Sequence, residues 1–254
     1  MKKIAKKVIF KFCPEVVIIL IKEFYYPYSL RRMNESDEPD LCIIKKLIKK
    51  GDNVIDIGAN VGLYTKCIST MVGDDGIVFS VEPIPTTFRI LKNNIKKLHL
   101  NNVKCLNVAI SSSDGYAFFD IPQNEYGVPN FYRATLVNEG DDNKIKVDTY
   151  KIDSLFGEQD IKFIKCDVEG HELECIKGAI GLIRSRKPAW LVEINDNPDV
   201  EGSNGERVVT IFHEEGYEPY VYCCGSFRRR IPGDKNINNF FLTSEHFRHI
   251  QGFF

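Results

Sequence analysis

The sequence predicts an α/β protein built on a doubly wound, mostly parallel β-sheet. Two observations lead to this prediction. Short, β-branched apolar runs alternate along the chain with segments whose apolar residues recur at helical spacing. The strand-like runs are apolar at nearly every position, as in sheets that helices cover on both faces.

Composition narrows the class of protein. The chain has 254 residues, with 34 Lys and Arg, 35 Asp and Glu and a formal charge of −1. This balance excludes a strongly basic nucleic-acid-binding chain, so we expect no nucleic-acid partner. The eight cysteines include no CxxC pair, which favours reduced thiols over a zinc or disulfide framework. We therefore expect a cytoplasmic protein.

The predicted elements begin with a strand at 54–57, between polar and glycine residues. Apolar residues at helical spacing over 63–71 indicate the helix that follows. A second strand is predicted at 77–81. Pro85 then opens a helix that extends to Leu98, because proline is favoured at the first helical position. A third strand is predicted at 103–110.

The alternation of strand and helix patterns is interrupted over 115–151. Strand patterns at 117–121 and 145–149 predict a β insertion with a mobile loop there. The βα alternation then resumes with strands at 161–168 and 189–194, helices at 173–183 and 208–215, and strands at 217–222 and 237–243. We expect the last two strands to form a hairpin that adds an antiparallel C-terminal strand at one edge of the sheet.

The N-terminal segment has a different character, so we divide the chain into an arm and linker at 1–40 and a main domain at 41–254. Residues 1–32 carry eight Lys and Arg against two Glu, and their longest wholly apolar run, 16–21, is too short to span a bilayer. Two interpretations stay open. The arm could lie as a helix on the inner face of an anionic membrane, or it could pack on the main domain with its lysines in solvent.

A candidate cofactor site follows the first predicted strand, which ends in Asp56, Gly58, Asn60 and Gly62. The glycines permit a tight turn and a close approach of backbone to a ligand. A dinucleotide site would require glycine at position 60 and at Leu63. The observed residues therefore argue against an NAD-type oxidoreductase and favour a ligand without a pyrophosphate.

The next two strand ends extend this site. Glu82 ends the second strand, where a carboxylate can accept hydrogen bonds from both hydroxyls of a ribose. Asn107 and Ala109 end the third strand, near the expected adenine; Asn107 could bond the ring amine or could simply form the turn. A nucleoside joined to an amino acid describes S-adenosylmethionine, which we predict as the cofactor.

Four blocks of sequence carry a resemblance to the FkbM-type S-adenosylmethionine-dependent methyltransferases. They are GDNVIDIGANVGLYT (51–65), VEPIPTTFRILKNNI (81–95), NVAISSSDG (107–115) and IKFIKCDVEGHELECIKGA (161–179). The resemblance runs from about residue 41 to residue 243. It implies a Rossmann-like class I methyltransferase fold with seven strands, and a hydroxyl-directed activity that often acts on a sugar or glycan.

The resemblance also carries residues over one by one. Asp56, Gly58, Asn60, Gly62 and Glu82 match the family's cofactor positions. A second family signature is matched by Asp167, Glu169, Gly170 and Glu172. Two residues depart from the usual pattern: Cys166 stands in place of an isoleucine, and His171 stands where alanine is frequent.

Methyl transfer to a hydroxyl requires a positioned base, because an alcohol is a poor nucleophile until it loses its proton. The candidate catalytic residues are Asp167, Glu169, His171 and Glu193, at or just past the ends of the fourth and fifth strands. His171 has the most suitable ordinary pKa. We predict no metal site, although Asp167 with Glu193 or Asp196 could alternatively hold Mg²⁺.

These observations predict an O-methyltransferase that acts on a hydroxyl of a sugar or glycoconjugate. We expect the segment 122–144 to help form the acceptor pocket, with contacts from Tyr126, Phe131, Tyr132 and Arg133. The alternatives are an N-methyltransferase and a module that binds S-adenosylmethionine without catalysis. The sequence leaves the acceptor and the oligomeric state open.

Overall fold

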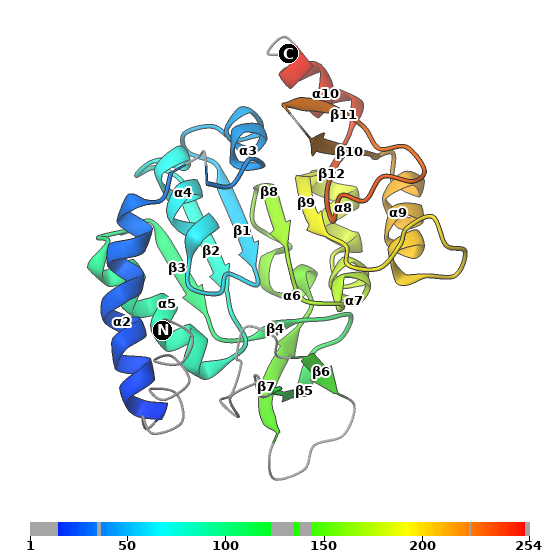
Figure 1. The fold of residues 1–254 in the computed structure, drawn as a ribbon. Helices are drawn as coiled ribbons and strands as arrows, with labels where there is room; N and C mark the ends of the chain where they lie inside the picture. Colours follow the sequence, from blue (N-terminus) through cyan, green and yellow to red (C-terminus); the bar gives the residue numbers. More distant parts are fainter. Residues whose placement is uncertain (1–14, 35–36, 123–134, 138–143, 224, 252–254) are drawn as a thin grey trace, which may run out of the picture.

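The centre of the molecule is an eight-stranded sheet, seen in a computed structural model that describes residues 15–34, 37–122, 135–137, 144–223 and 225–251 (Figure 1). The strand order is β11-β10-β12-β9-β8-β1-β2-β3. The strands are β1 (Asn53–Ile57), β2 (Ile77–Val81), β3 (Val103–Leu106), β8 (Ile161–Cys166), β9 (Ala189–Glu193), β10 (Glu218–Cys223), β11 (Ser226–Arg229) and β12 (Asn238–Leu242).

Five consecutive strands, from β9 to β3 at one edge, confirm the predicted parallel sheet. β1 pairs in parallel with β2 on one side and with β8 on the other, and β3 and β9 continue the parallel pairing outward. The chain order therefore reverses between β1 and β8. In sheets of this kind, ligands bind beyond the carboxyl ends of the strands at this reversal.

The C-terminal strands confirm the expected antiparallel addition, but its predicted place at the edge is wrong. β12 is antiparallel to both β9 and β10 and lies between them. Asn239, Phe240, Phe241 and Leu242 are buried, which suits an interior strand. The edge is formed by β11, an additional strand whose Arg229 is exposed, and charged side chains are typical of edge strands.

Helices cover both faces of this sheet. Three of them pack on one face: α3 (Leu41–Leu47), α4 (Leu63–Val72) and α10 (Ser244–Gln251). Four pack on the other: α6 (Ile152–Phe156), α7 (Glu172–Lys177), α8 (Ile180–Arg186) and α9 (Asn204–Glu214). Alternate strand residues feed the two resulting cores, because successive side chains of a strand point to opposite faces. Val54 lies in the first core and Ile55 in the second.

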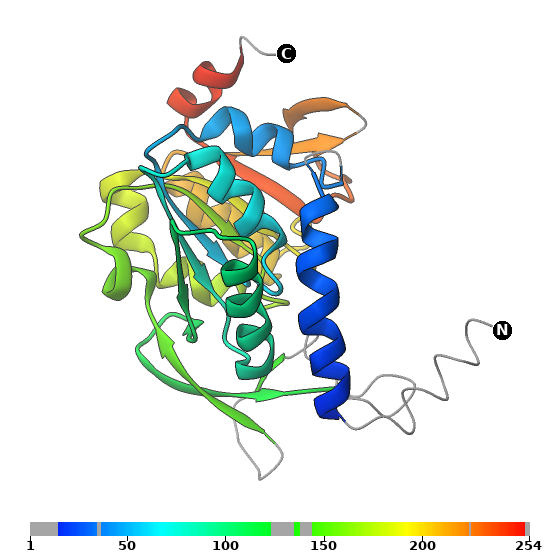
Figure 2. The same cartoon turned by 90° about the vertical axis from the view of Figure 1, so that its left-hand side faces the viewer.

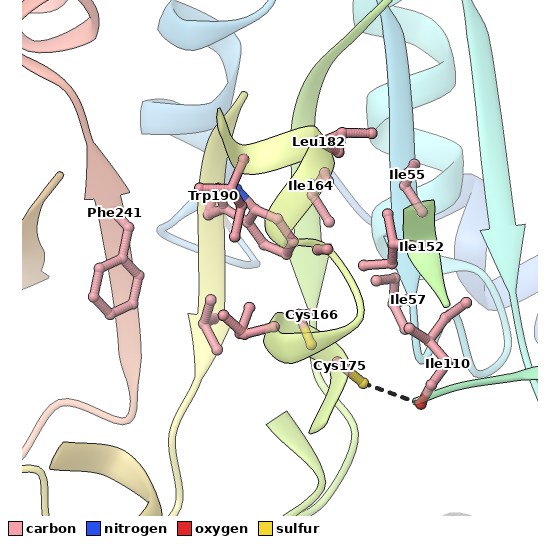
Figure 3. Close-up of a cluster of buried hydrophobic side chains, with 14 of the residues drawn as sticks. Ile55, Ile57, Ile110, Ile152, Ile164, Cys166, Cys175, Leu182, Trp190 and Phe241 are labelled. Atoms are coloured by element: carbon pink, nitrogen blue, oxygen red, sulfur yellow. Dashed lines mark hydrogen bonds between the residues drawn. The ribbon is translucent and has the colours of Figure 1, made fainter. Parts of the chain in front are cut away.

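The second core is the larger and includes Trp190, Phe212 and Phe241. The ring of Phe212 stacks on Phe241 at a centroid distance of 4.1 Å and meets Trp190 edge-on at 5.5 Å. Figure 3 shows that Cys166 and Cys175 are part of this core, where the Cys175 thiol donates a hydrogen bond to the carbonyl of Ile110 at 3.2 Å. No cysteine among the described residues forms a disulfide.

The third predicted strand is interrupted. β3 ends at Leu106, and β4 (Ala109–Ile110) leaves the main sheet to join a second sheet in the order β4-β7-β5-β6. This sheet contains β5 (Gly115–Asp120), β6 (Thr135–Val137) and β7 (Ile145–Tyr150). It is the β insertion that the sequence predicts. Most of the predicted loop at 122–144, including all four expected acceptor contacts, lies outside the described residues.

The sequence does not predict helix α3, and three further helical features differ from the prediction. The helix predicted at 173–183 is two short helices, α7 and α8, with Gly178 between them. A Cβ at Gly178 would overlap the carbonyl oxygen of Ser111. The backbone between the two helices therefore lies directly against the backbone at Ser111. Helices α6 and α10 were not predicted, because their short apolar patterns resemble those of connecting segments.

The N-terminal helix α2 (Glu15–Arg32) packs against α5 (Pro85–Lys97), as both views show (Figures 1 and 2). Arg89 Nε lies 2.7 Å from Glu23 Oε1, and the side chains of Asn93 and Lys97 donate to the Glu23 carbonyl at 2.9 and 3.1 Å. The division of the chain at residue 40 remains a prediction. Within the described residues, no helix combines the length and the apolar character that crossing a bilayer requires.

We predict that Phe212→Ala lowers the free energy of unfolding by about 3–5 kcal/mol, because it empties a fully buried site between aromatic rings. Ile231→Ala is the control: Ile231 is 56% exposed, and its truncation should change stability by no more than about 0.5 kcal/mol. Urea unfolding of both variants measures the difference. Equal effects would show that the aromatic cluster is not a principal part of the core.

Candidate functional site

Two adjoining cavities lie at the carboxyl ends of β1, β2 and β8. The first extends from the β1 turn past the end of β2 to β4, the start of α5 and Phe119 of β5. The second lies on the other side of the β1 turn, between Tyr64, Lys165 and Tyr26 of α2. Gly58, Asn60 and Asp167 line both cavities, so the β1 turn and the end of β8 form their junction.

The β1 turn can form only with small or permissive residues. Gly58 has φ +75°, and a Cβ there would overlap the carbonyl oxygen of Asp167. Asn60 is also left-handed, with φ 51°. Gly62 has φ +94°, and a Cβ there would lie 2.8 Å from Leu91 Cδ1 of α5. Gly58 therefore allows β1 and β8 to approach each other, while Gly62 allows α4 and α5 to do so.

Glu82 is held rigidly at the end of β2. It is 6% exposed, and its two carboxyl oxygens accept hydrogen bonds from the backbone N–H groups of Asn60 and Ile84, each at 3.0 Å. Burial raises the pKa of Glu82 to about 7, although these two hydrogen bonds oppose the shift. Each carboxylate oxygen keeps a lone pair for a further donor, such as a hydroxyl that enters the first cavity.

Three buried polar atoms on the cavity walls have no hydrogen-bond partner: Asp56 Oδ1, Asn60 Oδ1 and Thr87 Oγ1. Such atoms are costly in a folded protein unless a ligand or water satisfies them. The other Asp56 oxygen accepts from the Thr65 hydroxyl at 2.6 Å. Asp56 lines the second cavity, Thr87 the first and Asn60 both. The walls therefore offer acceptors to a ligand that occupies both cavities.

A buried lysine organises the second cavity. Lys165 is 5% exposed, and its Nζ lies 2.9 Å from Asp167 Oδ2 and 4.6 Å from the ring centre of Tyr64. Burial lowers the pKa of Lys165, but the charges of Asp167 and Asp56 outweigh it, so the net shift is upward. The ammonium group therefore stays charged and partly neutralises the surrounding carboxyl groups.

The four predicted catalytic residues take different positions. Asp167 lies at the junction, whereas Glu169 and His171 line the first cavity only. His171 Nε2 lies 3.1 Å from the Ser111 hydroxyl, and burial lowers the pKa of this histidine, while the charge of Glu174 opposes the shift. Glu193 is half-buried at the end of β9 and lines neither cavity.

Glu193 has a pKa suited to proton transfer near neutral pH. Burial and the negative charge of Asp167 raise the pKa of Glu193 to about 7, although Lys165 opposes the shift. The charge of Asp167 therefore influences the protonation of Glu193. Among the described residues, no group of three His, Cys, Asp or Glu side chains is arranged to hold a metal ion.

The two residues predicted to adjoin the adenine differ in placement. Ala109 lines the first cavity. The amide of Asn107 donates to the carbonyls of Glu82 and Pro83 at 2.9 and 2.8 Å, and Asn107 does not line the cavity. The structure thus shows Asn107 bracing the end of β2, and its contact with an adenine remains a prediction.

Sequence reasoning missed several residues of the cavity walls: Tyr26, Tyr64, Thr87, Phe119 and Lys165. Lys165 did give a signal, since a lysine within a buried strand is unusual unless it is paired. Phe119 gave none, because only the folding of the second sheet brings it to the end of β2.

The chain is similar to known proteins in sequence and in structure. Residues 56–219, more than half of the chain, match the Methyltransferase FkbM domain. The chain is 35% identical over 69 residues to a protein-L-isoaspartate O-methyltransferase of Methanococcus aeolicus, covering 26% of this chain and 32% of that protein. It is 29% identical over 150 residues to the hexuronic acid methyltransferase AglP of Haloferax volcanii, covering 56% of this chain and 57% of AglP.

A solved structure of Methyltransferase FkbM from Methylobacillus flagellatus KT is also similar. Its TM-score is 0.49 at 14% identity, over 77% of this chain and 44% of that chain. The family pattern implies seven strands, whereas the main sheet has eight, because β11 extends its edge.

The cavity walls also fit the cofactor that the sequence predicts. Glu82 can accept from ribose hydroxyls, and the unpartnered oxygens of Asp56 and Asn60 can accept from the ammonium group of a methionine moiety. The match over residues 56–219 shows that the chain belongs to the FkbM methyltransferase family.

Proposed function

We propose that the chain transfers the methyl group of S-adenosylmethionine to a hydroxyl of a sugar or glycoconjugate. The observation that carries the proposal is the position of Asp167 where the two cavities join, beside the buried Lys165. The sulfonium of a cofactor that spans both cavities would lie at this junction, so Asp167 would face an acceptor oxygen that approaches the methyl group. The similarity to the hexuronic acid methyltransferase AglP supports a sugar acceptor.

Binding of the cofactor would use both cavities. Glu82 would accept from the ribose hydroxyls, and the apolar walls at Ile84, Ala109 and Phe119 would enclose the adenine. Asp56 and Asn60 would face the amino-acid end in and beside the second cavity. The cofactor supplies an electrophilic methyl group on a sulfonium. The protein's part is to align an acceptor oxygen with that group and to remove its proton.

We assign the proton transfer to the Asp167–Glu193 pair. Lys165 holds Asp167 in place, so Asp167 would accept the hydrogen bond of the acceptor hydroxyl and orient it. As the methyl group is transferred, the hydroxyl proton would pass to Asp167 and from it to Glu193, which lines neither cavity and whose pKa of about 7 suits it to hold the proton. His171 and Glu169 lie on the wall of the first cavity, which the nucleoside would occupy. They would therefore contact the cofactor and not the acceptor.

An amine acceptor is the second candidate. The carboxyl groups of Asp56, Asp167 and Glu193 outnumber the single ammonium of Lys165, and this excess of acid would favour a cationic acceptor over an anionic one. An amine at alkaline pH needs no general base, unlike a hydroxyl. The two candidates therefore differ in how strongly their rates depend on Glu193.

The first prediction from this proposal concerns the affinity for the cofactor and its dependence on pH. Ribose hydroxyls donate to the ionised form of Glu82, so binding of S-adenosylhomocysteine should strengthen about tenfold between pH 6 and pH 8, as a pKa of about 7 requires. Glu82→Gln removes the titration. Its affinity should be about 10–100-fold weaker at pH 8 and nearly independent of pH.

Isothermal titration at several pH values measures both effects. Glu158→Gln changes an exposed glutamate outside both cavities and is the matched control. An unchanged pH dependence in Glu82→Gln would show that Glu82 does not contact the cofactor.

The second prediction concerns the rate. At saturating cofactor, kcat for a hydroxyl acceptor should rise with pH through an apparent pKa near 7, because Glu193 must be ionised to accept a proton. Glu193→Gln should lower kcat about 10²–10⁴-fold and leave the affinity for S-adenosylhomocysteine unchanged.

Transfer of a labelled methyl group to a panel of neutral sugars, uronic acids and amino sugars provides the assay. Full activity of Glu193→Gln on a neutral sugar would remove Glu193 as the base. Transfer confined to amino sugars would replace the hydroxyl acceptor with an amine.

A further inference from the structure

One face of helix α2 exposes an unusual amount of apolar surface. We call it the outer face of α2. Its residues are Val17, Leu20, Ile21, Phe24, Tyr25 and Tyr28, and they are 39–74% exposed. Their spacing of three or four residues aligns them along one side of the helix, and together they line a shallow hollow. Contiguous exposed apolar patches mark interaction surfaces, whereas scattered single residues do not.

The opposite face of α2 packs against the domain through the residues that the structure describes there. Glu23 binds three side chains of α5, and Leu30 is only 1% exposed. Arg31 adds a hydrogen bond from its guanidinium to the carbonyl of Lys97 at 2.8 Å. The helix is thus fixed to the domain in one orientation. Both views place α2 at the periphery beside α5 (Figures 1 and 2). The outer face is therefore a fixed part of the protein surface.

The charges in the sequence on either side of the outer face indicate its partner. Residues 1–14, which directly precede α2, contain five lysines and no Asp or Glu, although the whole chain has a formal charge of −1. Arg31 and Arg32 follow at the other end of the helix. An apolar stripe between two cationic segments matches an anionic lipid surface, where apolar side chains enter the acyl boundary and lysines approach the headgroups. Phe24, Tyr25 and Tyr28 suit this depth, because aromatic rings are favoured at membrane interfaces.

We propose that the outer face of α2 docks this protein on an anionic membrane surface. A second copy of the chain is a poorer partner for this face. A symmetric contact would bring the same surface of two copies together. The cationic segments of the two copies would then lie close to each other and repel. Anionic lipid removes this repulsion.

The same helix also reaches the second cavity, where Tyr26 lies on the wall with Tyr64 and Lys165. Docking through α2 would therefore hold this cavity close to the bilayer surface. A glycan carried on a lipid would then lie within reach of the site as an acceptor, an extension that rests on the proposed function. The docking itself does not depend on it.

Co-flotation of the full chain with vesicles tests the docking. We expect binding to phosphatidylcholine vesicles that contain about 30% phosphatidylglycerol, and little binding to phosphatidylcholine alone. Raising the salt from about 0.1 M to about 0.5 M should weaken the binding, because it screens the lysines.

Two double variants locate the surface. Leu20→Ser with Ile21→Ser removes two side chains of the outer face, which are 45% and 54% exposed, and should lower vesicle affinity at least tenfold. Val200→Ser with Ile231→Ser is the matched control, since these side chains are 53% and 56% exposed elsewhere. It should bind vesicles like the unchanged chain. Equal melting temperatures of the two variants would show that both are folded.

Three results would overturn the proposal. They are no flotation of the unchanged chain, equal binding by the two double variants, and equal binding to neutral and anionic vesicles. The outer face would instead be assigned to a second copy by a different pair of results. The unchanged chain and the control variant would be dimers in light scattering while the α2 variant is a monomer, and none of the three would bind vesicles. Cofactor titration of the same preparations separates these outcomes from a failure of the proposed function, because it requires no membrane.

Discussion

The site depends on one close approach of backbone to backbone, between Gly58 at the end of β1 and Asp167 at the end of β8. A side chain at Gly58 would occupy the position of the Asp167 carbonyl oxygen. The approach is fixed by a hydrogen bond from the Asp167 N–H to the Ile57 carbonyl at 3.1 Å, and by bonds from the N–H groups of Gly58 and Ala59 to the Val81 carbonyl at 3.0 Å. Three strand ends are thereby held together. The Asn60 N–H reaches Glu82, and Asp167 lies between the two cavities.

A second constraint is electrostatic. Burying Asp56 and Lys165 beside the half-buried Asp167 costs free energy, because each charge gives up hydration that the others replace only in part. Lys165 limits this cost and keeps Asp167 in place. Glu193 lies within reach of the same charges, and its pKa of about 7 results from its burial and from Asp167. The arrangement that strains the fold is thus the one that suits proton transfer near neutral pH.

Much of the fold could be predicted because buried parallel strands are short apolar runs, as at 54–57 and 77–81. The order of the last strands could not. The hydrophobic pattern of β12 shows that it is buried, but not that it lies between β9 and β10. The break between β3 and β4 was also hidden, since Asn107 ends the strand through bonds to the carbonyls of Glu82 and Pro83 that no local pattern shows.

The residues of the site also include some that the sequence predicts and some that it does not. Asp56, Gly58 and Glu82 could be placed from sequence because they follow predicted strands directly and meet at one edge of the sheet. Thr87 and Phe119 could not, because their positions depend on how α5 and the second sheet pack. The N-terminal segment gave two open interpretations. α2 packs on α5 and also keeps an apolar outer face, so its two faces correspond to the two alternatives.

The central claim is that one cofactor occupies both cavities, with its nucleoside in the first and its amino-acid end at Asp56 in the second. Isothermal titration of S-adenosylhomocysteine and of adenosine, into the unchanged chain and into Asp56→Asn, tests this most directly. The account predicts that S-adenosylhomocysteine binds more tightly than adenosine, and that Asp56→Asn weakens only the former. Equal affinity for the two ligands, or an equal loss for both in the variant, would contradict it.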